Sequence, residues 1–217
     1  MLEILYSDAE IAVIVKPAGM LSEEGGGIGV PSELRAALKT DAIYPVHRLD
    51  RETGGVMVYA RTKSAAAFLS RAIAQGQLEK TYFALVHGRP EAETGIFEDL
   101  LFRDMRKNKS YVVKRQRGGV RRASLSYQVL SEKDGISLVR IRLHTGRTHQ
   151  IRVQFASRRM PLVGDGRYGA ADGISRLGLF ACRLSFVHPV SGERMTYFAR
   201  PSGELWDGFD LTDADEN

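Results

Sequence analysis

The sequence predicts an α+β fold with a mixed, largely antiparallel central β-sheet and flanking helices. Short apolar segments outnumber helical ones, and several are separated by only a brief turn, which is typical of antiparallel strands. The regular alternation of strand and helix that builds a doubly wound parallel sheet is missing. The 217 residues contain no linker, repeat or low-complexity block. One domain over residues 1–217 is therefore the simplest organisation.

The N-terminal elements follow from apolar runs and turn residues. Strands are expected over 2–6 and 11–15, with a polar turn between them. Pro31 suits the first turn of a helix that continues through Leu38. The glycine-rich stretch 23–30 precedes this helix and lacks the spacing and the final Lys-Ser/Thr of a phosphate-binding loop, so we assign it no nucleotide role.

The middle of the chain alternates strands with one helix. A buried strand over 56–60 precedes a helix that Thr62 caps and that ends near Gln75, before Gly76. One face of this helix is apolar and carries Phe68, Leu69, Ala72 and Ile73. Apolar runs and alternating patterns predict further strands over 82–86, 96–102, 124–130 and 137–143.

The C-terminal part begins with a helix over about 148–157, in which Ile151 and Phe155 lie four residues apart on the inner face. Closing strands are expected over 177–187 and 195–199. The acidic residues 212–217 are expected to be frayed.

The composition excludes several classes of protein. The longest aliphatic run, Ile11–Val15, is five residues, whereas a membrane-spanning helix needs about 20 apolar residues. The first residues, Met1 to Ile4, lack the basic start, apolar stretch and cleavage site of a secretory signal, so none is expected. Cys182 is the only cysteine, which excludes a disulfide within the chain and argues against a thiolate zinc cluster. We expect a cytoplasmic protein that spans no membrane and uses neither metal nor cofactor.

The net charge of +5 conceals a strong asymmetry. Residues 103–122 contain nine basic residues and one acidic residue, and residues 139–160 contain six arginines and no acid. A basic run is often only a solvated loop. The density of arginine, with Tyr111 interleaved, favours a surface that contacts phosphate groups. Charge alone does not distinguish nucleic acid from another polyanion.

The first candidate for chemistry is the segment 47–55, which reads HRLDRETGG. An aspartate such as Asp50 between two arginines is ordinarily part of a surface ion pair. The apolar strand that follows, and Gly54-Gly55, which permit a sharp turn and close approach to a ligand, favour a functional role. Neighbouring guanidinium groups would keep the carboxylate ionised.

The second candidate is the segment 143–152, a glycine turn that leads into a helix. His144 and His149 lack a third metal ligand at a recognised spacing, so a hydrogen-bonded histidine that steadies the loop is the alternative for His149. Arg152 neighbours Ile151 and lies five residues after Arg147, so it can point partly inward. A buried arginine requires a carboxylate partner, and Asp50 is the natural candidate.

The third candidate is Tyr82, which follows Lys80 at the start of a strand. A tyrosine in this position most often belongs to the core or to the sheet surface. A tyrosine beside a basic cleft can instead stack on a nucleobase.

Together these segments resemble the RluA family of RNA pseudouridine synthases over nearly the whole chain. The resemblance rests on motifs that occur in family order: Lys16-Pro17-Ala18-Gly19, His47-Arg48-Leu49-Asp50 with Thr53 and Gly55, Lys80-Thr81-Tyr82, Thr145 to Arg152, Gly164-Asp165 with Tyr168-Gly169, and His188-Pro189. The chain departs from the family where Gly54 replaces a usual serine, and where Gln154 and Phe180 replace frequent histidines.

The resemblance implies a pseudouridine synthase fold and an isomerisation of uridine in ribosomal or transfer RNA. It implies that Asp50 is the catalytic carboxylate, that Arg152 pairs with it, and that Tyr82 stacks on the uracil. The other residues expected to bind substrate are Arg48, His47, Lys80, Arg147, His149, Arg115 and Arg117. RNA is the expected partner. No obligate protein partner is implied, so a monomer is expected.

Two other functions remain open at this point. A non-catalytic RNA-binding module explains the charge, but an unpaired acid in an RNA-binding surface would repel phosphate. A hydrolase of a small nucleoside or sugar explains a carboxylate beside arginine, but does not need two strongly basic segments. Detection of pseudouridine in a treated transcript distinguishes all three.

Overall fold

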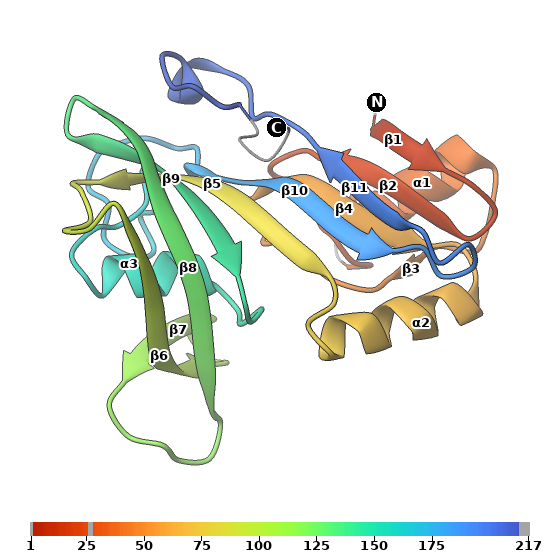
Figure 1. Ribbon diagram of the computed structural model, residues 1–217, viewed down its shortest axis with the longest axis horizontal. Coiled ribbons are helices and arrows are strands. Elements are labelled where there is room, and N and C mark those ends of the chain that lie inside the picture. The colour runs from red at the N-terminus through yellow and green to blue at the C-terminus, as the bar shows by residue number, and fades with distance from the viewer. Residues whose placement is uncertain (1, 26–27, 213–217) are drawn as a thin grey trace. The chain divides into compact units, whose positions relative to one another are not determined.

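The computed structural model describes residues 2–25 and 28–212. These residues form a mixed, mostly antiparallel sheet with three α-helices, which confirms the predicted fold class (Figure 1). The chain divides into two compact units. Unit 1 contains the described residues up to Lys80 and Phe180–Pro201, and unit 2 contains Thr81–Leu179 and Ser202–Thr212. The prediction of one domain over residues 1–217 is not tested by this division into units.

Unit 1 is built on strands that neighbour one another in the order β1, β2, β4 and β10, with β3 beside β4 and β11 beside β10. The pairing of β4 with β10 is parallel, and the other pairings are antiparallel. The strands are β1 (Glu3–Ser7), β2 (Ile11–Lys16), β3 (Tyr44–Pro45), β4 (Gly54–Ala60), β10 (Leu179–Val187) and β11 (Arg194–Phe198).

Two helices accompany this sheet, α1 (Val30–Leu38) and α2 (Lys63–Ala74). Pro31 lies in the first turn of α1, and the Thr62 hydroxyl accepts a hydrogen bond from the Ala65 N–H at 3.1 Å, as expected for an N-cap. The predicted apolar face of α2 packs on the core of unit 1. Its contacts are with the cluster that includes Leu69, Val58, Leu184 and Phe186.

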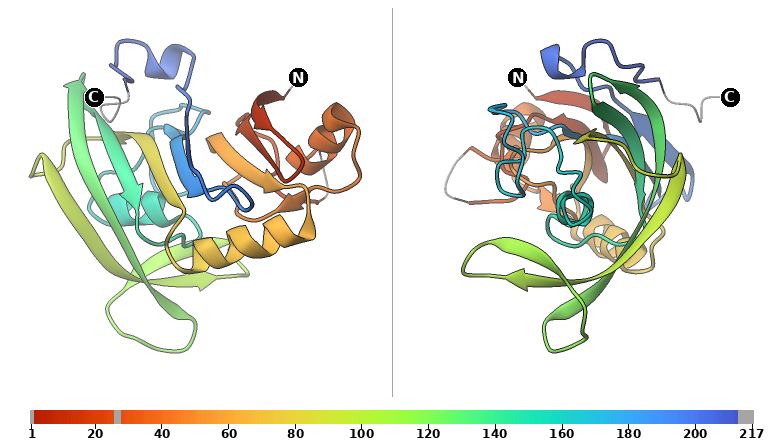
Figure 2. Two further views of the ribbon diagram at one scale, coloured as in Figure 1. Left: turned by 45° about the vertical axis from the view of Figure 1, so that its right-hand side comes forward. Right: turned by 90° about the vertical axis from the view of Figure 1, so that its left-hand side faces the viewer.

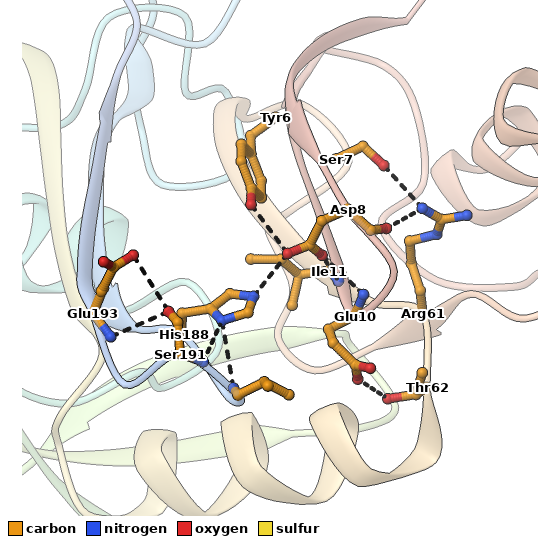
Figure 3. Close-up of polar contacts among 11 residues, drawn as sticks. Tyr6, Ser7, Asp8, Glu10, Ile11, Arg61, Thr62, His188, Ser191 and Glu193 are labelled. Carbon is orange, nitrogen blue, oxygen red and sulfur yellow. Dashed lines mark hydrogen bonds and ion pairs between the residues drawn. The ribbon is translucent and has the colours of Figure 1, made fainter.

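Asp8 and His188 join the β1–β2 turn to the β10–β11 turn (Figure 3). Asp8 Oδ1 accepts two backbone N–H groups of its own turn, at 2.8 Å each. Asp8 Oδ2 accepts from the Tyr6 hydroxyl at 3.0 Å and lies 2.9 Å from His188 Nε2. His188 Nδ1 accepts the Ser191 N–H at 3.0 Å, so its proton resides on Nε2. The His188-Pro189 motif therefore holds two turns together.

Unit 2 is built on strands that neighbour one another in the order β5, β9, β8, β6 and β7. The long strands β6 and β8 run side by side and antiparallel (Figure 2). The strands are β5 (Glu79–His87), β6 (Thr94–Asp104), β7 (Lys109–Val113), β8 (Val120–Lys133) and β9 (Ile136–Leu143). The boundary between the units falls within β5 and β10.

The third helix, α3 (Gln150–Ala156), begins two residues later than predicted. His149 precedes it with a left-handed backbone, φ 55°, which is outside the helical range. Ile151 and Phe155 are buried, as the sequence pattern predicted. The Phe155 ring lies 5.0 Å from that of Phe97, so α3 packs on β6 through aromatic contacts.

Several short elements were not expected from the sequence. Strand β7 lies inside the basic stretch 103–122, where its short Ser-Tyr-Val-Val core is masked by charged neighbours. Strand β3 and the 3₁₀ turn Glu204–Trp206 are also too short to leave a periodic pattern. The expected fraying of 212–217 falls, beyond Thr212, outside the described residues. No helix in the ranges described is long and apolar enough to cross a membrane.

Candidate active site

The residues singled out from the sequence divide between the two units. Unit 1 contains His47, Arg48 and Asp50, which precede β4 in the sequence, and Lys80, the second residue of β5. Unit 2 contains the remaining candidates: Tyr82, Arg115, Arg117, Arg147, His149 and Arg152. The candidate carboxylate, Asp50, and its predicted partner, Arg152, thus belong to different units.

Asp50 lies in a turn whose N-terminal side is fixed by Ser22. The Ser22 hydroxyl donates to the Leu49 carbonyl at 2.8 Å and accepts the Leu49 N–H at 3.0 Å. Ser22 is itself held through its carbonyl, which accepts from the buried Tyr59 hydroxyl at 2.8 Å. The Leu49 side chain is buried. The residue immediately before Asp50 therefore has little freedom to move.

The C-terminal side of the same turn is fixed by Lys16. Its ammonium group is fully buried and donates to the carbonyls of Arg51 at 3.1 Å, Met20 at 2.8 Å and Pro17 at 3.0 Å. Gly19 adds a reciprocal pair, donating its N–H to the Arg51 carbonyl at 2.7 Å and accepting from Arg51 Nε at 2.9 Å. Asp50 is therefore held between two anchored backbone positions.

Lys16 also places a positive charge near the catalytic candidate. Burial lowers the pKa of Lys16 to about 8, while the carboxylates of Glu52 and Asp50 act in the opposite direction. The residue was missed as a functional candidate. Its signal was an isolated lysine that ends an apolar strand directly before Pro17. A lysine in that position must find carbonyl or carboxylate partners inside the fold.

The two glycines after the turn have a packing role that the sequence did not predict, while close approach to a ligand stays a prediction. They lie in β4, and Gly55 has φ +128°. A Cβ atom on Gly55 would lie 2.2 Å from the Ala181 carbonyl oxygen, so this glycine makes room for β10. A Cβ on Gly54 would lie 3.3 Å from the Phe180 ring. Two of the three departures from the family pattern, Gly54 and Phe180, are therefore neighbours.

His47 is a half-buried histidine that ties two segments of unit 1 together. Its Nε2 accepts the Val58 N–H at 3.2 Å, which ties the segment before Asp50 to β4. Burial, with a contribution from the charge of Lys80, lowers the pKa of His47 to about 3. Arg48, by contrast, is 60% exposed and forms an ion pair with Glu23 at 2.9 Å. Of these side chains, Arg48 is the one presented to solvent.

Arg152 forms a bidentate ion pair with Asp165 inside unit 2. Its Nε lies 2.7 Å from Asp165 Oδ2 and one terminal nitrogen lies 2.8 Å from Oδ1. Both side chains are buried, at 5% and 0% exposure. The sequence correctly predicted an inward arginine with a carboxylate partner but missed Asp165. Pairing of Arg152 with Asp50 stays a prediction.

Tyr168 connects this ion pair to strand β7. Its ring lies 5.3 Å from the Arg152 guanidinium and 5.0 Å from the Lys109 ammonium. Its hydroxyl accepts the Ser110 N–H at 2.8 Å and lies 2.9 Å from His149 Nδ1. His149 therefore steadies its loop, as the structural alternative predicted. Among the described residues, no group of three or more side chains is arranged to hold a metal ion.

Gln150 organises the turn that precedes α3. Its Oε1 accepts from the Thr145 hydroxyl at 2.8 Å and from the Arg147 N–H at 3.0 Å, and its Nε2 donates to the Ser124 carbonyl at 3.1 Å. Arg147 Nε donates to the Arg122 carbonyl at 3.0 Å, although the residue is exposed overall. This turn is thereby fastened to the basic end of β8.

The remaining candidates differ in exposure. Tyr82 is buried within β5, at 5% exposure. Arg115 and Arg117 are exposed in the turn between β7 and β8. The Arg117 guanidinium lies 5.1 Å from the centre of the Phe102 ring, which gives the turn a cation–π contact. The basic stretch is thus partly ordered strand and partly exposed turn.

Comparison with protein families matches residues 10–157 to RNA pseudouridylate synthase. An uncharacterized RNA pseudouridine synthase of Zymomonas mobilis is 36% identical over 202 residues, covering 88% of this chain and 91% of that protein. The ribosomal large subunit pseudouridine synthase C of Escherichia coli is 34% identical over 206 residues, covering 88% and 64%. The chain spans about two thirds of the length of most of the similar curated proteins.

Solved structures give the same result for the fold. The human RNA pseudouridylate synthase domain containing 1 superimposes with a TM-score of 0.79 at 24% identity, covering 93% of this chain and 84% of that one. The human RNA pseudouridylate synthase domain containing 4 gives 0.76 at 25% identity, covering 91% and 88%. The arrangement of strands and helices is therefore shared with these two structures.

Proposed function

Because the chain belongs to the RNA pseudouridylate synthase family, we propose that it converts uridine to pseudouridine in RNA with Asp50 as its catalytic carboxylate. The reaction is an isomerisation. The bond between the ribose C1′ and the uracil nitrogen breaks, the base rotates, and a bond from C1′ to a ring carbon forms. The proton on that carbon is lost and the freed nitrogen gains one, so the atoms balance without oxidant or reductant.

The observation that supports this proposal is the way Asp50 is held. When a glycosidic bond breaks, positive charge develops on the sugar. A correctly placed carboxylate stabilises this charge or attacks the sugar as a nucleophile, and its other proposed role is that of a base toward the sugar. Ser22 fixes the residue before Asp50 and Lys16 fixes the residue after it. Such a preorganised turn loses little entropy when the sugar binds. A merely structural surface aspartate needs no such support.

Other residues are assigned to binding and positioning. Arg48, exposed next to the turn, is proposed to contact the flipped-out base, which must leave its stack to be reached. Arg152, oriented by Asp165, is proposed to pair with Asp50 and keep it ionised. Tyr82 is proposed to stack on the uracil and to assist removal of the ring proton.

The basic segments are proposed to hold the RNA backbone. Exposed arginines occur in the β7–β8 turn and in the turn before α3, among them Arg115, Arg117 and Arg147. Their planar groups contact phosphate in pairs of hydrogen bonds. Relatives include proteins named for the large ribosomal subunit, so ribosomal RNA is the first substrate to test and transfer RNA the second. We propose a monomer that acts in the cytoplasm.

The substitution Asp50→Asn tests the assignment. It retains size and removes the negative charge, so pseudouridine formation should fall below detection while thermal unfolding and RNA affinity stay close to those of the wild type. Pseudouridine is measured in ribosomal and transfer RNA transcripts by carbodiimide labelling and primer extension. Asp99→Asn, which alters a carboxylate paired with Arg158 in unit 2, provides the control. Full activity of Asp50→Asn contradicts the proposal.

A further inference from the structure

The turn between β6 and β7 displays an apolar side chain at its tip. Met105 is 70% exposed and follows Asp104, the last residue of β6. Four basic residues lie within four positions of it in the sequence: Arg103, Arg106, Lys107 and Lys109. A methionine surrounded by cations gains nothing from folding, because its surface stays in water. Its placement calls for a ligand that offers both apolar faces and negative charge.

The turn is rigid enough to present this side chain in a fixed direction. Asp104 Oδ1 accepts the N–H groups of Arg106 at 2.9 Å and Lys107 at 3.0 Å, which closes the turn on itself. Asn108 has a left-handed backbone, φ 45°. Arg167 donates to the Asn108 carbonyl at 3.3 Å, which attaches the turn to the loop that follows Asp165.

The base of the hairpin is joined to the turn that precedes α3. The Ser110 hydroxyl donates to the Thr148 carbonyl at 2.7 Å, and the Ser110 N–H donates to the Tyr168 hydroxyl at 2.8 Å. Lys109 lies over the same tyrosine ring at 5.0 Å. The hairpin is therefore tied to the part of unit 2 that carries Arg147 and Arg152.

The other strongly exposed apolar residues have different surroundings. Val190, in the β10–β11 turn, is 71% exposed, and the residues on either side of it are Pro189 and Ser191, followed by Gly192 and Glu193. Single exposed apolar residues of this kind are common and need no explanation. Met105 differs in the cluster of cations around it. Val190 consequently supplies a control for exposure without a cluster of cations, since Arg194 is the one lysine or arginine within four positions of it.

We propose that Met105 is an apolar wedge that enters a base step of the substrate RNA while the neighbouring cations contact the flanking phosphates. Methionine is among the side chains that proteins insert between stacked bases, and its flexible thioether adapts to an irregular step. Unstacking at this point lowers the cost of extruding a nearby uridine. RNA is favoured as the occupant because four positive charges against the one carboxylate of Asp104 match a polyanion. The inference rests on the proposed function.

The test compares Met105→Gln with Met105→Leu and Val190→Ala. Gln keeps the length and charge of the side chain but not its apolar end, whereas Leu keeps the apolar character. A uridine-containing stem–loop RNA with 2-aminopurine in its stem reports both affinity and unstacking. We expect Met105→Gln to weaken binding by about fivefold to tenfold, with an unchanged salt dependence because no charge is lost. The fluorescence rise that wild type causes should disappear. Met105→Leu and Val190→Ala should resemble wild type.

Equal affinity and equal fluorescence for wild type and Met105→Gln overturn the wedge. A loss of affinity accompanied by a smaller salt slope also overturns it, because that result assigns the effect to displaced cations. The binding readout does not depend on catalysis. Absence of pseudouridine in the wild-type reaction therefore contradicts the proposed function, while the fluorescence result still decides the role of Met105.

Discussion

The two units stabilise a buried cation in different ways: unit 1 surrounds Lys16 with carbonyls, and unit 2 pairs Arg152 with a carboxylate. In unit 1 the buried Lys16 donates to three backbone carbonyls, so its charge is set among neutral acceptors and loses part of its hydration. In unit 2 the buried Arg152 meets the carboxylate of Asp165 in a two-pronged pair. Burial consequently lowers the pKa of Lys16 to about 8, whereas a paired arginine stays charged at any physiological pH.

The difference shows that Lys16 positions backbone, whereas Asp165 orients a side chain. Lys16 fixes the backbone of the turn that carries Asp50. Asp165 fixes a side chain, since its two oxygens determine the plane of the Arg152 guanidinium. The strongly basic segments 103–122 and 139–160 both belong to unit 2. In the proposed reaction, unit 1 supplies the carboxylate, and unit 2 supplies the arginine and the basic residues that bind RNA.

The largest effect is expected from breaking the pair in unit 2. Arg152→Met leaves the Asp165 carboxylate buried without its guanidinium, which should lower the free energy of unfolding by about 3–5 kcal/mol. Adding Asp165→Leu removes that charge and should restore much of the stability but none of the pseudouridine formation. Urea unfolding and the pseudouridine assay measure the two effects. The partly exposed Arg158, paired with Asp99, provides the control, and Arg158→Met should cost less. Equal costs would contradict this account of burial.

A smaller effect is expected from Lys16→Met in unit 1. Removing the ammonium group costs three hydrogen bonds to carbonyls, of which the Arg51 carbonyl keeps the Gly19 N–H. The expected cost is about 3 kcal/mol in total, because relief of the buried charge offsets part of the loss. The rate constant kcat should fall more than RNA affinity, since the Asp50 turn loosens. Wild-type activity should decline as pH rises through about 8, where Lys16 loses its proton. Lys16→Met should lack this decline. Normal kcat in a folded variant would exclude a positioning role.

The smallest effect is a pH dependence of stability from His47. Its pKa is lowered from 6.5 to about 3, so between these values the unfolded chain binds a proton that the folded chain does not. Stability from this group is complete above pH 6.5 and is lost as pH falls toward 3, by about 2 kcal/mol between pH 7 and pH 5. His47→Gln keeps an acceptor for Val58 and does not titrate. Its unfolding free energy should fall less over that range. Parallel curves would assign the acid sensitivity elsewhere.

The sequence was most informative where a pattern is local. Thr62 predicted the start of α2, and Pro31 predicted the first turn of α1, because capping and proline geometry depend only on neighbouring residues. Strand β7 escaped prediction because its apolar core is short and charged on both sides. Gly55 was correctly marked as unusual, but its close contact with the backbone of Ala181 was not predicted, because Ala181 is distant in sequence.

By itself the sequence determined the fold class, the family motifs and the concentration of positive charge, since each depends on residue type and order along the chain. Only the tertiary structure decided which partner each buried charge would have. Asp165 is 13 residues from Arg152, and Arg51 is 35 residues from Lys16. A buried charge requires compensation, which is a general rule, but the group that supplies it depends on which distant backbone or side-chain atoms folding brings within hydrogen-bonding distance.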